Sequence, residues 1–351
     1  GRRARLDRFF GAIKPGKPTL YLKHVLLPHG PYMFLPSGKQ TRRTFRDPLP
    51  GMNGPVGFGS RTLTEHNRQR LQLQIAFADR EIGRMITRMK ANGTYDPSLI
   101  AITADHGISF QVGVKDRRTA TRSNIDEVAP VPLFIKAPGQ RRGRTSSAYA
   151  RTVDVVPTIA DLLNFKMPYA ADGRSAFSAA VGKRRFVRMI RRGFNGTITV
   201  SAKAMEKRRR ALVRDKVAKF GQGDFASLYT GIGPNRQLLG KEVAALKPAA
   251  QGKVRTQIAN AADMRNVDPR SEIHATQVAG SLTGGKGRGR DLAVAVNGRI
   301  EAVGQTFRLR GSSKESYALM VPESALKPGR NTVELFEVTD KGAKLQLIGK
   351  A

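Results

Sequence analysis

The chain has 351 residues and a formal net charge of +35 at pH 7, from 62 basic and 27 acidic side chains, and its length allows two domains with a hydrophobic core each. Cysteine is absent, which excludes disulfides and cysteine-based metal sites. No stretch approaches the roughly 20 uninterrupted apolar residues of a transmembrane helix, so we expect this chain itself to be soluble.

Residues 19–27 (TLYLKHVLL) combine β-branched, aromatic and aliphatic side chains, which predicts a buried strand followed by a Pro/Gly-rich loop. His24 would lie on this strand and His29 just past its end. The two histidines would share one side of the strand only imperfectly, because five residues separate them.

A long helix is predicted next. Thr62 and Glu65 match a capping box, in which a hydroxyl and a carboxylate three residues apart bind the unpaired amides of a helix start. Apolar residues from Leu71 to Met89 then recur at three- and four-residue spacing. Asn92-Gly93 can adopt the left-handed backbone conformation that ends a helix. His66 falls on the first turn of this helix, where we expect a surface position.

Two further strands and a helix complete an α/β pattern. Residues 99–103 predict a fully buried strand that runs into Asp105 and His106, and residues 131–136 predict another strand. A short apolar helix over 155–163 would be capped by Asp154. Strands alternating with helices predict a mainly parallel sheet flanked by helices, with ligands bound beyond the carboxyl ends of the strands.

The segment 183–219 is strongly basic, with fourteen Lys or Arg residues against Glu206 and Asp215. It is open whether this segment is a solvated linker or contacts phospholipid headgroups. Arg is also scattered over the whole chain, as a biased coding composition would produce. The basic run lacks the interleaved aromatic residues of single-strand nucleic-acid binders, so we expect no specific nucleic-acid partner.

The C-terminal part changes character. Residues 291–296 have the alternating side-chain pattern of a strand and lead directly into Asn297-Gly298, a strong signal for a two-residue hairpin loop. Further strand-turn-strand patterns continue to residue 348. We predict a β-rich, sandwich-like domain over 270–351, after the α/β part over 1–182 and a basic linker or helical region over 183–269. Residues 280–287 resemble a phosphate-binding loop, but Gly287 replaces the required hydroxyl residue, so a flexible loop is the preferred interpretation. His274, just before these strands, has no recognisable partner and receives no role.

Asp105 and His106 are the candidate metal ligands. A carboxylate oxygen beside an imidazole nitrogen suits a divalent cation with mixed oxygen and nitrogen ligands. An Asp-His-Gly sequence alone is more often a structural turn. The position directly after an apolar strand, at the edge where α/β sheets bind ligands, favours the metal site.

Four ordered segments resemble the sulfatase/alkaline phosphatase superfamily, which includes lipoteichoic-acid-synthase-like enzymes. Ile100–Gly107 (IAITADHG) resembles the metal-binding strand of this superfamily, and Tyr21–Tyr32 is similar to the segment that carries a substrate-facing histidine. Val131–Gly139 and the stretch from Thr152 through Asp172-Gly-Arg-Ser175 are similar to the segments that follow. The resemblance ends near residue 180.

The resemblance implies metal-dependent hydrolysis or transfer of a sulfate or phosphate ester. It places one divalent cation (calcium, manganese, magnesium or zinc) on Asp105 and His106, and gives His29 a catalytic role at the anionic group; His24 is a weaker candidate for substrate binding. The partner would be an anionic ester. The lipoteichoic-acid-synthase-like relatives imply a membrane-anchored parent protein with an extracytoplasmic catalytic domain.

The nucleophile of the family is not recognisable. Relatives carry a Ser, Thr or modified Cys and a first acidic ligand before the histidine segment, whereas the residues before Thr19 include only Asp7 and no hydroxyl or thiol side chain. We therefore expect the nucleophile upstream of Gly1 in a longer protein, with these 351 residues alone inactive. The alternative is a non-catalytic relative that uses the fold to bind an anionic polymer or membrane surface.

Overall fold

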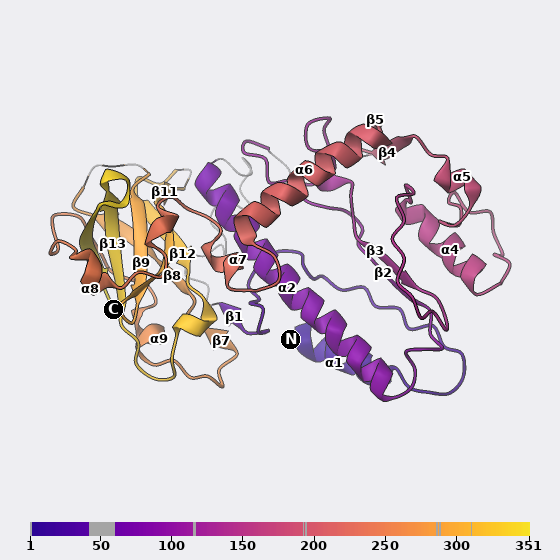
Figure 1. Ribbon diagram of the computed structural model, residues 1–351, viewed down its shortest axis with the longest axis horizontal. Helices are drawn as coiled ribbons and strands as arrows, with labels where there is room; N and C mark the ends of the chain where they lie inside the picture. The colour runs from indigo at the N-terminus through magenta and orange to yellow at the C-terminus, as the bar shows by residue number, and fades with distance from the viewer. Residues whose placement is uncertain are drawn as a thin grey trace. The chain divides into compact units, whose positions relative to one another are not determined.

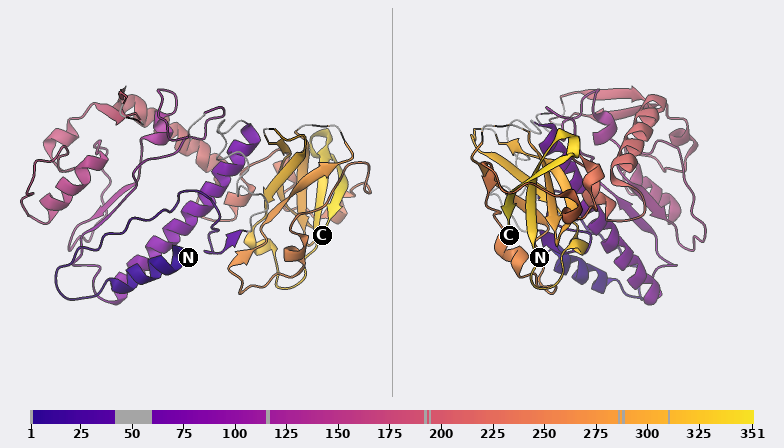
Figure 2. Two further views of the ribbon diagram at one scale, coloured as in Figure 1. Left: turned by 180° about the vertical axis from the view of Figure 1, so that it is seen from behind. Right: turned by 60° about the vertical axis from the view of Figure 1, so that its left-hand side comes forward.

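A computed structural model (Figures 1 and 2) describes residues 2–41, 60–114, 117–191, 193, 195–285, 287, 289–309 and 311–351. The chain divides into two compact units. Unit 1 comprises Gly1–Val25, Glu81–Ser109 and Asp116–Arg214, and unit 2 comprises Leu26–Arg80, Phe110–Lys115 and Asp215–Ala351.

Two long helices and several short ones are present in the described residues. The α-helices are α1 (Arg2–Ala12), α2 (Arg61–Ala91), α3 (Ile125–Val128), α4 (Val155–Leu162), α5 (Ala179–Gly182), α6 (Ala202–Phe220), α7 (Ser227–Thr230), α8 (Val243–Leu246) and α9 (Ala261–Arg265). Short 3-10 helices are η1 (Thr152–Asp154), η2 (Arg236–Leu238), η3 (Glu323–Ala325) and η4 (Asp340–Gly342).

The strands are short in the N-terminal half and longer after residue 276. They are β1 (Gln40–Thr41), β2 (Ile100–Thr103), β3 (Leu133–Lys136), β4 (Phe186–Ile190), β5 (Thr197–Ser201), β6 (Arg255–Thr256), β7 (Ile273–His274), β8 (Gln277–Thr283), β9 (Asp291–Val296), β10 (Arg299–Gln305), β11 (Phe307–Arg308), β12 (Glu315–Met320), β13 (Val333–Thr339) and β14 (Lys344–Lys350).

The predicted β-sandwich is present in unit 2 (Figure 2, right). One sheet has the order β10-β9-β13-β14 and the other β11-β12-β8-β6, and neighbouring strands in both run antiparallel. Val278 and Leu319 of one sheet share a buried core with Val294 and Leu335 of the other. Burial of these aliphatic faces drives the two sheets together.

The hairpin loop lies where the sequence predicts it. Val296 pairs with Arg299, and Asn297 and Gly298 between them have φ of 52° and 86°. Both values lie in the left-handed region that a type I′ turn requires, which Asn and Gly tolerate best. Residues 280–283, by contrast, belong to β8 and pair with β12 or β6, so the prediction of a flexible loop is wrong for them.

The long helix α2 is confirmed, but its predicted start is wrong. The helix begins at Arg61, and the Ser60 hydroxyl accepts a hydrogen bond from the Leu63 amide at 3.1 Å, so Ser60 and not Thr62 caps it. Its predicted face also differs, because Leu73 and Phe77 are buried while Ile75 is exposed. His66 is buried as well, and burial lowers its pKa to about 3, so the expected surface position is wrong.

The predicted parallel sheet is not found in the described residues. β2 and β3 form a two-stranded antiparallel sheet. Parallel pairing in the described residues is limited to the two-residue strands β1 and β7 and one isolated bridge between Ala249 and Gln346. Residues 19–27 form no strand and are largely exposed. The 100–103 strand is only partly buried, and Phe134 on its partner is 65% exposed. An apolar run becomes a buried strand only when other elements cover it, and these runs lack such cover here.

The basic run of 183–219 is regular structure and not an irregular linker. β4 and β5 form an antiparallel hairpin, and α6 follows directly. Val187 and Ile198 on the inner face of this hairpin pack with Met205 of α6 and with Ile125 and Val128 of α3. This small core belongs to unit 1.

Candidate active site around Asp105 and His106

The Asp-His-Gly sequence follows β2 and is anchored to α3. The Gly107 amide donates to the Val128 carbonyl at 2.7 Å, and a Cβ atom at Gly107 would lie 2.2 Å from the Glu127 carbonyl oxygen. Only glycine allows this close approach of two backbones. Ile125 and Val128 of α3 are fully buried, so the loop that carries Asp105 and His106 rests on a packed core.

Asp105 and His106 point their ligand atoms toward one another. The Asp105 Oδ1 accepts a hydrogen bond from the His106 amide at 2.9 Å, and the Asp105 Oδ2 lies 3.5 Å from the His106 Nε2. The His106 Nδ1 lies 2.7 Å from the Gly107 carbonyl oxygen, which can only accept, so Nδ1 must carry the proton. In the neutral ring, Nε2 then carries a lone pair that faces the Asp105 carboxylate oxygen. A cation bound between these two electron-rich atoms would stabilise the arrangement.

This geometry fits a divalent metal ion. Metal bonds to carboxylate oxygen and imidazole nitrogen measure about 2.0–2.6 Å, and 3.5 Å is less than twice that length, so both atoms can belong to one coordination shell. The Asp105 side chain is 82% exposed and the His106 side chain 33%. Within the described part of the chain, no group of three or more His, Cys, Asp or Glu side chains is close enough to hold a metal ion. Asp105 and His106 are therefore two candidate ligands.

His29 lies on an exposed turn in unit 2, with its Nδ1 2.8 Å from the Gly30 carbonyl. His24 is exposed in an irregular segment of unit 1, not on a strand. The structure thus brings Asp105 and His106 together. A common cleft for His29 and this pair stays a prediction, because they belong to separately described units.

Gln74 of α2 holds the His29 turn, and the sequence analysis missed it. Its side-chain amide donates to the Pro28 and His29 carbonyls, both at 2.9 Å, while its oxygen accepts from the Met33 and Phe34 amides at 3.1 and 3.3 Å. Gln74 is fully buried. A glutamine on the buried face of a helix is the signal that could have found it, because a buried amide needs partners.

Replacing Gln74 by Leu is expected to destabilise unit 2 by roughly 2 kcal/mol or more, since it removes all of the hydrogen bonds that its buried side chain makes to the turn. We expect faster hydrogen exchange of the Met33 and Phe34 amides and a lower thermal unfolding midpoint. Gln72→Leu, the same change at a less buried position of α2, is the matched control and should have little effect. Equal protection of the turn in both variants would contradict the assignment.

Asp154 occupies the predicted N-cap position of α4, but its side chain makes no capping hydrogen bond to that helix and instead joins neighbouring segments of the chain. Its carboxylate accepts hydrogen bonds from the Arg151 and Arg174 amides at 2.7 and 2.9 Å and forms an ion pair with Arg184. Burial alone would raise the pKa of Asp154, but hydrogen bonds from Arg184 and the two amides lower it on balance. A Cβ atom at Gly173 would lie 2.0 Å from the Val153 carbonyl oxygen, so only glycine fits this crossing.

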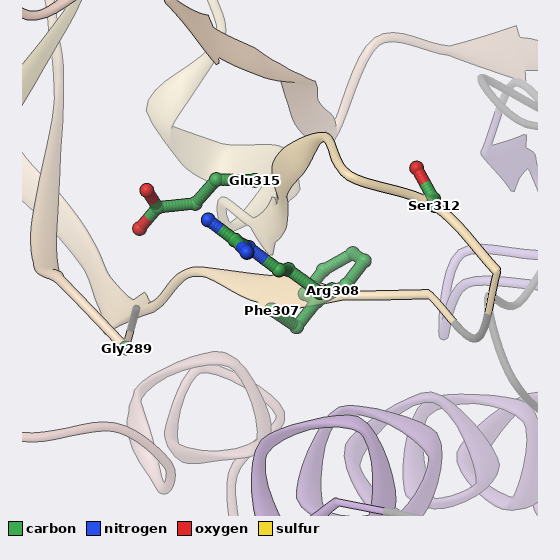
Figure 3. Close-up of a pocket in the computed structure, with 5 residues that line it drawn as sticks. All are labelled: Gly289, Phe307, Arg308, Ser312 and Glu315. Atoms are coloured by element: carbon green, nitrogen blue, oxygen red, sulfur yellow. The ribbon is translucent and has the colours of Figure 1, made fainter. Parts of the chain in front are cut away.

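A shallow pocket of about 330 Å³ lies in the β-rich part and is distinct from these residues (Figure 3). The pocket is lined by Gly289, Phe307, Arg308, Ser312 and Glu315. The Arg308 side chain extends toward Glu315. Glu315 already accepts hydrogen bonds from Thr306 at 2.5 Å and Arg290 at 3.4 Å. This carboxylate is structural.

Comparison with known proteins identifies the family of the region that contains Asp105. Residues 3–165 match the sulfatase family. This part of the chain is a sulfatase-family domain of the alkaline phosphatase superfamily. Asp105, His106, His29 and His24 all lie inside it. Sulfatases typically bind a divalent metal, in keeping with the ligand types of the Asp105-His106 pair.

Curated relatives match over part of their length. An ulvan-active sulfatase of Formosa agariphila is 28% identical over 166 residues, 46% of this chain and 31% of the relative. The multifunctional alkaline phosphatase superfamily protein PehA of Trinickia caryophylli is 34% identical over 96 residues, 27% of this chain and 18% of the relative. The chain thus spans less than a third of the length of either. The solved structure of a 2-O GAG sulfatase aligns with a TM-score of 0.35 and 14% identity, covering 61% of this chain and 57% of that one.

The helices of the described residues include none that is both long and apolar enough to cross a membrane. The two longest, α2 and α6, both contain many charged residues.

Proposed function

We propose that this sulfatase-family chain takes part in metal-dependent hydrolysis of a sulfate ester, with Asp105 and His106 as metal ligands. The observation that carries the proposal is the 3.5 Å approach of the Asp105 Oδ2 and the His106 Nε2 inside the family-matched region. A divalent cation at this position polarises the ester oxygens and stabilises the negative charge that develops on them. The names of the curated sulfatases favour sulfate over phosphate as the transferred group.

The residues of this chain have separate tasks in the proposal. Asp105 and His106 orient each other, because the Asp105 carboxylate accepts from the His106 amide and Gly107 fixes the imidazole proton on Nδ1. His29, held by the Gln74-bound turn, contacts the anionic group or donates a proton to the leaving oxygen. The high positive charge of the chain attracts an anionic ester.

The test is an assay of aryl sulfate and aryl phosphate esters with calcium, manganese, magnesium or zinc, and with a chelator. It uses the 351-residue chain and, as a separate sample, the whole product of the gene that encodes it. We expect hydrolysis of the sulfate ester by the sample that carries a nucleophile, on the order of 100-fold faster with metal than with chelator. Turnover that is unchanged by the chelator would contradict the metal assignment, and preference for the phosphate ester would contradict the substrate class.

A further inference from the structure

The β4–β5 hairpin has one buried face and one solvent-exposed face. Alternation along β4 buries Val187 and turns Phe186, Arg188 and Ile190 to the other side, where they pair across the hairpin with Ser201, Thr199 and Thr197. Phe186 is 54% exposed and Ile190 60%. We call this exposed side of the hairpin, on which Phe186 and Ile190 flank Arg188, the outer face.

The same segment carries no negative charge. Residues 183–201 include no Asp or Glu. Their basic residues are Lys183, Arg184, Arg185, Arg188, Arg191 and Arg192. Arg184 is engaged by Asp154, whereas Lys183, Arg185, Arg188 and Arg191 are exposed. Arg188 therefore lies on the outer face between the two apolar side chains, and Lys183, Arg185 and Arg191 add exposed positive charge beyond the ends of β4.

A partner for this face must offer negative charge at its surface and an apolar phase behind it. A soluble sulfated polymer provides the charge but no apolar phase, and a nucleic acid admits apolar side chains only between its bases, at the cost of unstacking them. An anionic lipid bilayer provides both, because lipid phosphates lie directly above the acyl chains. Arginine side chains can reach the phosphates while their aliphatic stems stay beside the apolar pair.

We propose that the outer face of the β4–β5 hairpin docks on an anionic lipid bilayer, with Phe186 and Ile190 inserted at the level of the headgroups and Arg188 bound to lipid phosphate. The docking does not depend on the proposed ester hydrolysis. It would bring the chain to a membrane surface, where anionic or membrane-bound esters are concentrated.

Co-sedimentation with vesicles tests the proposal. The chain should bind vesicles that contain phosphatidylserine more tightly than vesicles of phosphatidylcholine alone. Arg188→Glu should weaken the partition onto anionic vesicles about tenfold, and the double variant Phe186→Ser/Ile190→Ser should do so by a similar factor. Two changes in the same unit serve as matched controls, because Arg141 and Phe177 are comparably exposed there: Arg141→Glu and Phe177→Ser should alter binding less than twofold.

The absence of tryptophan from the chain allows a direct probe of insertion. Phe186→Trp introduces a single indole, whose emission should shift to the blue and be quenched by brominated lipid when anionic vesicles are added. Phe177→Trp should show neither change. Circular dichroism of each variant establishes that it is folded.

Three results would overturn the proposal. Equal loss of binding in Arg188→Glu and Arg141→Glu would show that the net charge of the whole chain, and not the hairpin, drives adsorption. An unshifted indole emission from the fully bound Phe186→Trp variant would show that the apolar pair does not insert. Loss of heparin binding but not of vesicle binding in the hairpin variants would show that the partner is a soluble polyanion.

Discussion

Replacing Asp105 by Ala is expected to lower metal-stimulated ester hydrolysis by roughly 10²–10³-fold, measured in the sample that is active in the assay above. The carboxylate is one of the two proposed ligands, and a metal ion contributes several kcal/mol to the stabilisation of developing charge. His106→Ala should have a similar effect, because it removes the other proposed ligand, whose Nε2 lies 3.5 Å from the Asp105 Oδ2. The double variant should be little worse than either single one, since the two residues act as a unit.

Metal binding can be measured without turnover. Paramagnetic Mn²⁺ should broaden the imidazole NMR signals of His106 more than those of His24, which is exposed but lies on an irregular segment without a neighbouring acid ligand in the sequence. Asp105→Ala should remove this selectivity. Asp96→Ala is the matched control, because Asp96 is an exposed aspartate of the same unit that contacts Arg141 at 3.8 Å. Selective broadening that survives Asp105→Ala would disprove the ligand assignment.

Removing one partner of the Asp154–Arg184 ion pair should destabilise unit 1 by about 3–5 kcal/mol, for Asp154→Asn or Arg184→Met. Asp154 is completely buried and the Arg184 side chain is 12% exposed, so either change leaves a buried charge without its counter-charge. Chemical denaturation measures the loss. Arg141→Met breaks an exposed pair in the same unit and should cost about 1 kcal/mol or less.

The contribution of the Asp154–Arg184 ion pair to the free energy of unfolding should fall as the pH is lowered. The pKa of Asp154 is lowered in the folded chain, so its contribution to stability is complete above the ordinary aspartate pKa of about 3.9 and is lost as the pH falls through the lower folded value. The difference in stability between the parent chain and Asp154→Asn should therefore be constant near neutral pH and shrink in acid. A difference that grows as the pH falls would contradict the ion-pair explanation.

Features that depend on neighbouring residues could be predicted from the sequence. Asn297 and Gly298 make their turn because their own backbones accept positive φ. The long helix follows from residues that recur at helical spacing over several turns. Asp105 and His106 contact each other because they are adjacent in the chain, and Gly107 after them allows the backbone to pass close to Glu127. Each of these rests on local conformational preference.

Tertiary structure alone decided the features that depend on distant partners. Residues 19–27 have the composition of a strand but lie exposed, and β2 and β3 pair antiparallel instead of entering a large parallel sheet. Gln74 meets the His29 turn across more than 40 residues, and Asp154 finds Arg184 across 30. Composition and spacing specify which surfaces can be buried. Which surfaces actually meet depends on the whole chain, because hydrophobic burial is not directional and hydrogen-bond partners are chosen only once the elements have packed.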